Sequence, residues 1–136
     1  MAFVQENWLL ILVAFVSGAM LVWPLVQRGF SPMKGIGTAE MTRLINSRDA
    51  LPLDLREPKE FEGGRLPNAV HLPLSQLGTR VGELAKHTGK PVVAYDTNGS
   101  RARAAGGPLA KAGFSEVYHL NGGFRAWKDA GLPVER

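Results

Sequence analysis

The sequence predicts an α/β protein in which a mainly parallel sheet carries helices on both faces, after one apolar N-terminal helix. Between residues 38 and 130, short apolar segments alternate with helical stretches of about ten residues, a pattern typical of parallel βα units. Glycines and prolines separate these elements. The chain therefore divides into a transmembrane helix over residues 1–27, a linker over 28–37 and a globular domain over 38–136.

The N-terminal segment is predicted to lie in the lipid bilayer. No charged residue occurs from Asn7 to Gln27, and a helix of this length reaches about 31 Å, the thickness of the bilayer core. Trp8 and Trp23 stand near its two ends, where indole rings favour the membrane interface. A cleaved signal peptide is the alternative, but it needs a basic leader, and the leader here carries only Glu6.

The positive charges after this segment predict its orientation. Arg28, Lys34 and Arg43 follow the span, which places the N-terminus outside and the globular domain in the cytoplasm, at the plasma (inner) membrane of a single-pass protein. Ala14 and Gly18 are four residues apart, the spacing at which small residues let two membrane helices approach. This pair favours, at most, a weak homodimer.

The remaining elements follow from apolar periodicity and from turn residues. The tether RGFSPMKGIG has three glycines and one proline, and Thr38 is a candidate cap for the first helix. Strands are expected over residues 50–56, 70–72, 92–95 and 116–120. Helices are expected after Thr38, over 57–61, from Ser75 to about Lys86, up to Lys111 and over 124–130. Within the fourth helix, Gly106-Gly107-Pro108 predicts a kink or a restart near Pro108.

Composition excludes several classes of function. The chain has no cysteine, so it forms no disulfide, offers no thiolate to a metal and performs no cysteine catalysis by itself. Its net charge is +4, but Lys and Arg are scattered, which argues against nucleic-acid binding. The histidines at 71, 87 and 119 share no metal-ligand spacing. We therefore predict no metal and no cofactor.

Two long segments resemble the signatures of rhodanese-like domains. The first, LPLDLREPKEFEGGRLPNAVHLPLSQL, begins at Leu51, and the second, AGFSEVYHLNGGFRAWKDAGLPV, begins at Ala112. The matching positions are Asp54, Arg56, Glu57, Phe61, Gly64, Pro67 and Ala69, then Gly122, Gly123, Trp127, Gly131 and Pro133. The resemblance covers about residues 36–136 and implies a three-layer α/β/α domain around a five-stranded, mostly parallel sheet. With the apolar segment, the layout is similar to small bacterial membrane proteins bearing one rhodanese-like domain.

The chain departs from that family in the active-site loop. Family sulfurtransferases carry a cysteine at the end of the strand, usually followed by arginine, in a six-residue loop. The loop here consists of Asp96, Thr97, Asn98, Gly99, Ser100 and Arg101. Asp96 stands for the cysteine, Thr97 for the arginine, and Arg65 for a histidine of the first signature. Sulfur transfer needs a thiolate that forms a persulfide, and a carboxylate would repel thiosulfate, so the resemblance implies an inactive enzyme.

Three roles remain open for Asp96. It would accept hydrogen bonds from the N–H groups of its own loop, filling an anion cradle that the family uses for substrate. It would otherwise be an ordinary exposed loop residue. A phosphoryl-accepting role would require a metal and converging carboxylates, for which Asp54 is the candidate.

The sequence therefore favours a non-catalytic, membrane-tethered module that binds a protein partner at the cytoplasmic face. The loop 96–101, with Arg56 and Arg65, is the candidate contact surface for that partner or for an anion. The alternative is a sulfurtransferase or sulfur-carrier protein of the thiosulfate sulfurtransferase family that works with a thiol from a partner chain.

Overall fold

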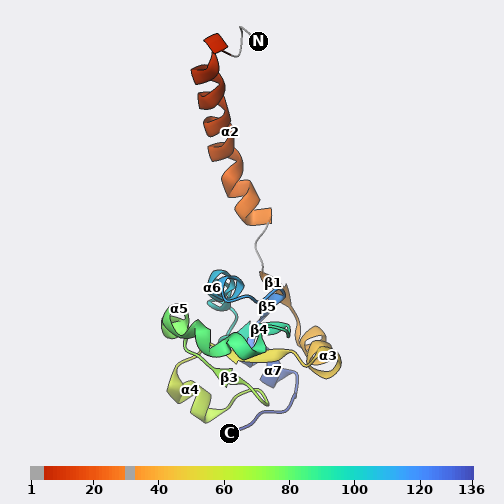
Figure 1. Cartoon of the computed structure of the whole chain (residues 1–136). Helices are drawn as coiled ribbons and strands as arrows, with labels where there is room; N and C mark the ends of the chain where they lie inside the picture. Colours follow the sequence, from red (N-terminus) through yellow and green to blue (C-terminus); the bar gives the residue numbers. More distant parts are fainter. Residues whose placement is uncertain (1–4, 30–32) are drawn as a thin grey trace. The chain divides into compact units, whose positions relative to one another are not determined.

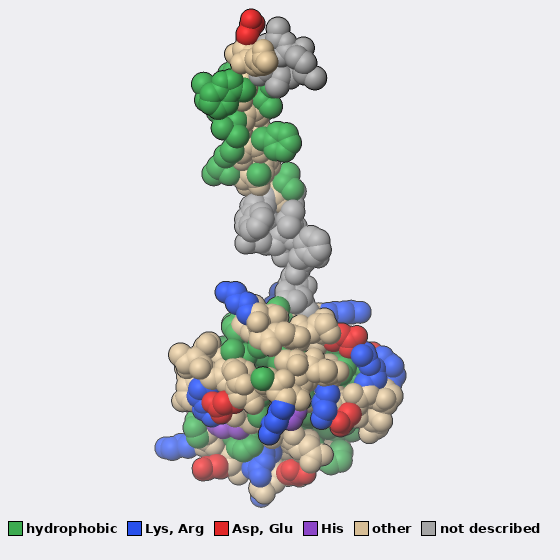
Figure 2. All heavy atoms as spheres, in the orientation of Figure 1, with side chains coloured by type: hydrophobic (Ala, Val, Ile, Leu, Met, Phe, Trp, Pro, Cys, Tyr) green, Lys and Arg blue, Asp and Glu red, His purple; other side chains and the backbone are tan. Residues whose placement is uncertain are grey.

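The computed structural model of the chain describes residues 5–29 and 33–136, except for the side chains of residues 23–29. It divides into two compact units, Met1–Ser31 and Pro32–Arg136 (Figure 1). The first unit contains helix α2 (Trp8–Gly29), whose described apolar side chains, such as Leu10 and Phe15, are exposed (Figure 2). In the described part of the chain, no helix combines the length and the apolar character needed to cross a membrane.

The transmembrane helix predicted over residues 1–27, with residues 7–27 in the bilayer, is thus not shown, and residues 1–4 of it lie outside the described residues. Part of that prediction, over residues 23–27, concerns side chains that lie outside the described residues. The helical conformation itself was predicted correctly, since α2 covers nearly all of the expected segment.

The second unit is built on a five-stranded sheet (Figure 1). Its strands are β1 (Met33–Ile36), β2 (Leu51–Asp54), β3 (Val70–His71), β4 (Val92–Tyr95) and β5 (Val117–Leu120). They lie in the order β1-β5-β4-β2-β3, and each described pairing of neighbouring strands is parallel. The predicted five-stranded parallel sheet is confirmed.

Short helices connect the strands. The α-helices are α3 (Thr38–Arg48), α4 (Pro58–Gly63), α5 (Leu77–Arg80), α6 (Gly106–Lys111) and α7 (Gly123–Asp129). Three 3-10 helices complete the connections: η1 (Leu74–Gln76), η2 (Val81–His87) and η3 (Ala102–Ala105). The break before Pro108 is a restart, because η3 ends at Ala105 and α6 begins at Gly106.

Two apolar clusters cover the two faces of the sheet. Along β4, Val92 and Ala94 belong to a cluster with α5, η2, η3 and α6. Val93 and Tyr95 belong to a second cluster with Met41 of α3 and with α7. Because successive strand residues point to opposite faces, a strand buried on both sides must be apolar throughout, and all four residues of β4 are fully buried. This is the expected three-layer arrangement.

Two predicted boundaries were wrong. The linker predicted over 28–37 contains β1, an edge strand that pairs with β5 from Met33 to Ile36, so the sheet begins before Thr38. The single helix predicted from Ser75 to Lys86 is divided into η1, α5 and η2. Gly78 and Gly82 lie within this stretch, and glycine lowers helix stability by about 1 kcal/mol relative to alanine.

Candidate functional site

The loop that follows β4 closes around the side chain of Asp96. This carboxylate accepts hydrogen bonds from the backbone N–H groups of Gly99 and Arg101, and Asp96 is only 5% exposed. Asp96 is therefore not an ordinary exposed loop residue. The arrangement is the one expected of a loop that holds its own anion, because inward-pointing N–H groups form a seat for negative charge.

The closing signature holds this loop in place from the other side. Phe124 N donates to Asp96 O at 2.8 Å, and Arg125 N donates to Thr97 O at 2.9 Å. The approach requires glycine: a Cβ on Gly123, whose φ is +60°, would lie 2.5 Å from Asp96 O. Hydrogen bonds and close packing therefore join the loop to the start of α7, although the two segments are far apart in the sequence.

A buried ion pair anchors the floor of the site. Arg56 Nη2 lies 2.8 Å from Asp54 Oδ2, and Arg56 also donates to Gly64 O and lies over the Phe124 ring at 4.2 Å. Tyr95 Oη donates to Asp54 Oδ2 at 2.7 Å, and burial raises the pKa of Tyr95 above its ordinary value. Asp54 thus ties Arg56 to the local turn, and the Arg56 guanidinium is occupied by groups of its own chain.

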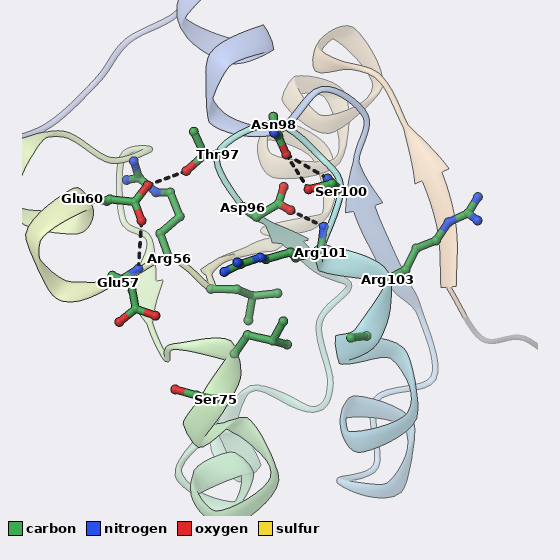
Figure 3. Close-up of a pocket in the computed structure, with 13 residues that line it drawn as sticks. Arg56, Glu57, Glu60, Ser75, Asp96, Thr97, Asn98, Ser100, Arg101 and Arg103 are labelled. Carbon is green, nitrogen blue, oxygen red and sulfur yellow. Dashed lines mark hydrogen bonds between the residues drawn. The ribbon is translucent and has the colours of Figure 1, made fainter.

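A cavity of about 750 Å³ opens beside the loop (Figure 3). Its lining residues come from the loop, from the start of α4 and from η1 and η3: Leu55, Arg56, Glu57, Glu60, Leu74, Ser75, Asp96, Thr97, Asn98, Ser100, Arg101, Arg103 and Ala104. Figure 3 shows the Arg101 side chain reaching into the cavity and that of Arg103 pointing away from it. Arg103 Nε lies 3.5 Å from His119 Nε2.

The structure brings most of the predicted site residues together. Arg56 and all loop residues except Gly99 line the cavity, and Gly99 contributes an N–H group to Asp96. Arg65 does not line it. Its guanidinium lies 4.5 Å from the Phe61 ring, and its backbone pairs with Glu135, so the structure does not bring Arg65 together with the loop, and its role as an anion or partner contact stays a prediction.

The acidic wall of the cavity was missed. Glu57 and Glu60 belong to the first turn of α4, where their side chains and backbone N–H groups form a capping box. Glu60 Oε2 also accepts a hydrogen bond from Thr97 Oγ1 at 2.5 Å. The signal was present in the sequence, since two residues three apart in a helical turn share one face.

Phosphoryl transfer through a metal finds no support in this geometry. Both oxygens of Asp54 are engaged by Arg56, and one of them also by Tyr95. Among the residues with described side chains, no group of three or more His, Cys, Asp or Glu is placed to hold a metal ion.

The fold and the two signatures define a rhodanese-like domain. The model of the rhodanese-like domain family matches residues 38–130, and the chain belongs to this family. It is 38% identical over 107 residues to the uncharacterized protein YibN of Escherichia coli K12, over 78% of this chain and 75% of the relative. It is 36% identical over 92 residues to a protein of Allochromatium vinosum named sulfurtransferase, over 68% of this chain and 84% of that one.

Solved structures agree with this assignment. A rhodanese-related protein from Thermoplasma volcanium superposes with a TM-score of 0.66 at 27% identity, covering 75% of this chain and 97% of that structure. In the family's active-site loop this chain has Asp96, and no cysteine exists elsewhere in it to take over the role.

Proposed function

We propose that this protein is a catalytically inactive rhodanese-like module that binds a protein partner at the cytoplasmic face of the plasma membrane. One observation carries the proposal: the Asp96 carboxylate occupies the cradle formed by the N–H groups of Gly99 and Arg101. A sulfur-transferring loop needs a thiolate at its start, and it needs the N–H groups free for a bound anion or persulfide. The Asp96 side chain meets neither requirement: it offers no thiolate, and its carboxylate already occupies the N–H groups.

The loop has nevertheless kept its ordered form. Hydrogen bonds from Phe124 and Arg125 hold it, and the cavity beside it remains open at about 750 Å³. A rigid loop beside an open cavity, without a nucleophile, is suited to recognition rather than to chemistry.

The test is sulfur transfer by the purified full chain. We expect no thiocyanate from thiosulfate and cyanide above the protein-free background, and no added sulfur in the intact mass after incubation with thiosulfate. Asp96→Cys is expected to gain one sulfur atom as a persulfide. Ser100→Cys, which puts a thiol elsewhere in the same loop, is the control and should gain far less. Thiocyanate formed by the unaltered chain and lost in Asp96→Ala would refute the proposal.

Membrane attachment is the second part of the proposal. In the sequence, residues 7–27 carry no charge, and Arg28 and Lys34 follow them, which is the arrangement of a helix anchored with its positive end in the cytoplasm. The full chain is then expected to stay in the membrane fraction after alkaline carbonate extraction, whereas a chain lacking residues 1–29 is released. Release of the full chain would contradict this part alone.

A sulfurtransferase that uses a partner's thiol is the second candidate. It is favoured by the open cavity and by the relative of Allochromatium vinosum that is named a sulfurtransferase. It predicts that the full chain accelerates the release of sulfite from thiosulfate by a soluble thiol such as glutathione. The leading proposal predicts the same rate with the native and the heat-denatured chain.

A further inference from the structure

The wall of the cavity that faces the loop carries two negative charges, those of Glu57 and Glu60. Glu57 and Glu60 are exposed, and within the described residues neither carboxylate forms an ion pair. Glu60 is held in place by Thr97 Oγ1 at 2.5 Å and by Glu57 N at 3.4 Å. Two like charges three residues apart in one helical turn disfavour each other, so a bound cation would relieve an existing repulsion.

The opposite side of the cavity is closed to anions. The anion cradle is already filled by Asp96. Arg56 is paired with Asp54 at 2.8 Å, and Arg103 points away from the cavity. The side chain of Arg101 is the remaining cation that reaches into it (Figure 3). Among the lining residues, the two carboxylates of Glu57 and Glu60 therefore stand against this one unpaired guanidinium, a balance that repels an oxyanion and attracts a cation.

The lining also has an apolar part. Leu55, Leu74 and Ala104 line the cavity; Leu74 is half-buried and Ala104 is exposed, whereas Leu55 is only 4% exposed. Long basic side chains rest their methylene groups on such a surface while the charged end stays at its polar edge. The side chain of Arg101 already reaches into the cavity (Figure 3) and, in the part of the chain described, forms no ion pair.

We propose that this cavity receives an arginine or lysine side chain from a partner protein, with its stem on Leu74 and Ala104 and its cationic end beside Glu57 and Glu60. The inference rests on the proposed function and gives the partner's chemistry. Arg101 then acts as a competitor that the arriving side chain displaces.

Binding of matched peptides to the full chain in a non-ionic detergent tests this assignment. The probes are three fluorescently labelled, end-blocked peptides, Leu-Ala-X-Ala-Leu, in which X is arginine, norleucine or glutamate, and the readout is anisotropy. We expect the arginine peptide to bind at least tenfold more tightly than the other two. The preference should weaken with added salt, because screening reduces exposed charge interactions.

Variants that remove individual charges test whether the cavity prefers a cation or an anion. Glu57→Gln with Glu60→Gln removes both charges while the amide oxygens can still accept the capping hydrogen bonds, and we expect about tenfold weaker binding of the arginine peptide. Arg101→Ala should strengthen it severalfold. Glu62→Gln, on the same helix but outside the cavity lining, is the matched control and should change nothing. An oxyanion site would show the reverse: weaker binding in Arg101→Ala and stronger binding in the double glutamine variant.

The cation preference of the cavity, the assignment to a protein segment and the proposed function are tested by separate outcomes. Absence of binding by the arginine peptide up to millimolar concentration, or equal binding of all three peptides, overturns the inference. Binding of free butylguanidinium as tight as that of the arginine peptide overturns the assignment to a protein segment. Thiocyanate measured on the same preparations is independent, because its formation would overturn the proposed function whether or not the peptide binds.

Discussion

Asp54 and Asp96 stand at the carboxyl ends of two neighbouring parallel strands, and both are buried. Asp54 is held by two side chains: that of Arg56, two residues further along, and that of Tyr95, 41 residues further along. Asp96 is held by backbone N–H groups three and five residues ahead. Asp54 thus joins separate parts of the domain, whereas Asp96 closes a single loop.

This difference separates the framework of the fold from its chemistry. The Asp54 network joins the end of β2 to Tyr95 of β4 and, through Arg56, to Gly64 at the end of α4, so its loss would affect the whole domain. The Asp96 loop needs only an acceptor for its own N–H groups, and a carboxylate supplies it as well as a bound anion would. The cysteine position of the family can therefore change to aspartate while the fold is kept.

The largest effect is expected from Asp54→Ala. It leaves the Arg56 guanidinium buried without its counter-ion, and removing one partner of a buried pair costs about 3–5 kcal/mol. Urea unfolding followed by the fluorescence of buried Trp127 should show this loss, or the chain should fail to fold. Glu83→Ala breaks an ion pair whose partners are 41% and 58% exposed, and is expected to cost at most about 1 kcal/mol. Equal losses of unfolding free energy in the two variants would contradict the contrast between the buried Asp54 network and a surface ion pair.

Gly123→Ala tests the contact that joins the loop to α7. The new Cβ would lie 2.5 Å from Asp96 O at a φ of +60°, and overpacking with backbone strain should cost about 2–4 kcal/mol. Gly78→Ala is the matched control, because a Cβ there meets nothing within 4 Å. It lies in α5, where alanine should stabilise by up to about 1 kcal/mol. Similar unfolding midpoints for the two variants would mean that the close approach is unimportant.

Asp96→Ala should have a smaller effect. Two N–H groups lose their acceptor in a loop that lies near solvent, at a cost of about 1–3 kcal/mol, and Asp96→Asn should recover part of it through its amide oxygen. Exposed Asp129, replaced by alanine in parallel, controls for the loss of a carboxylate alone. If the two alanine variants unfold at the same urea concentration, Asp96 does not stabilise the loop.

Which parts of the fold could be predicted depends on the kind of signal in the sequence. The strands around Val92–Tyr95 are apolar throughout, and the two signatures have a fixed spacing, so the parallel sheet and the loop position were predictable. β1 was missed because its residues Met33–Ile36 include a lysine and a glycine and lie at the sheet edge, where one side of the strand needs no partner.

The site was predictable only in part for a related reason. The loop residues are consecutive, so local sequence brings them together. The backbone of Arg65 pairs with that of Glu135, 70 residues further along. No local sequence pattern reveals that contact. The opposing charges of Glu60 and Arg101 likewise meet across one cavity only after the sheet has aligned the ends of β2 and β4.

The smallest expected effect is that of the Asp96 charge on the pKa of His119, which lies on β5. Burial lowers the pKa of His119 below its ordinary value of 6.5, Arg103 lowers it further, and Asp96 raises it. Because the folded state then binds the proton less well than the unfolded chain, stability is fully present above pH 6.5 and is lost as the pH falls below it. His119→Asn should remove this part of the pH dependence of urea midpoints.

Asp96→Ala should enlarge that loss, because it takes away the neighbour that favours the charged imidazole. No comparable change is expected in Asp129→Ala. A pH dependence that is the same with and without Asp96 would mean that its carboxylate acts only on its own loop, which would make the contrast with Asp54 complete.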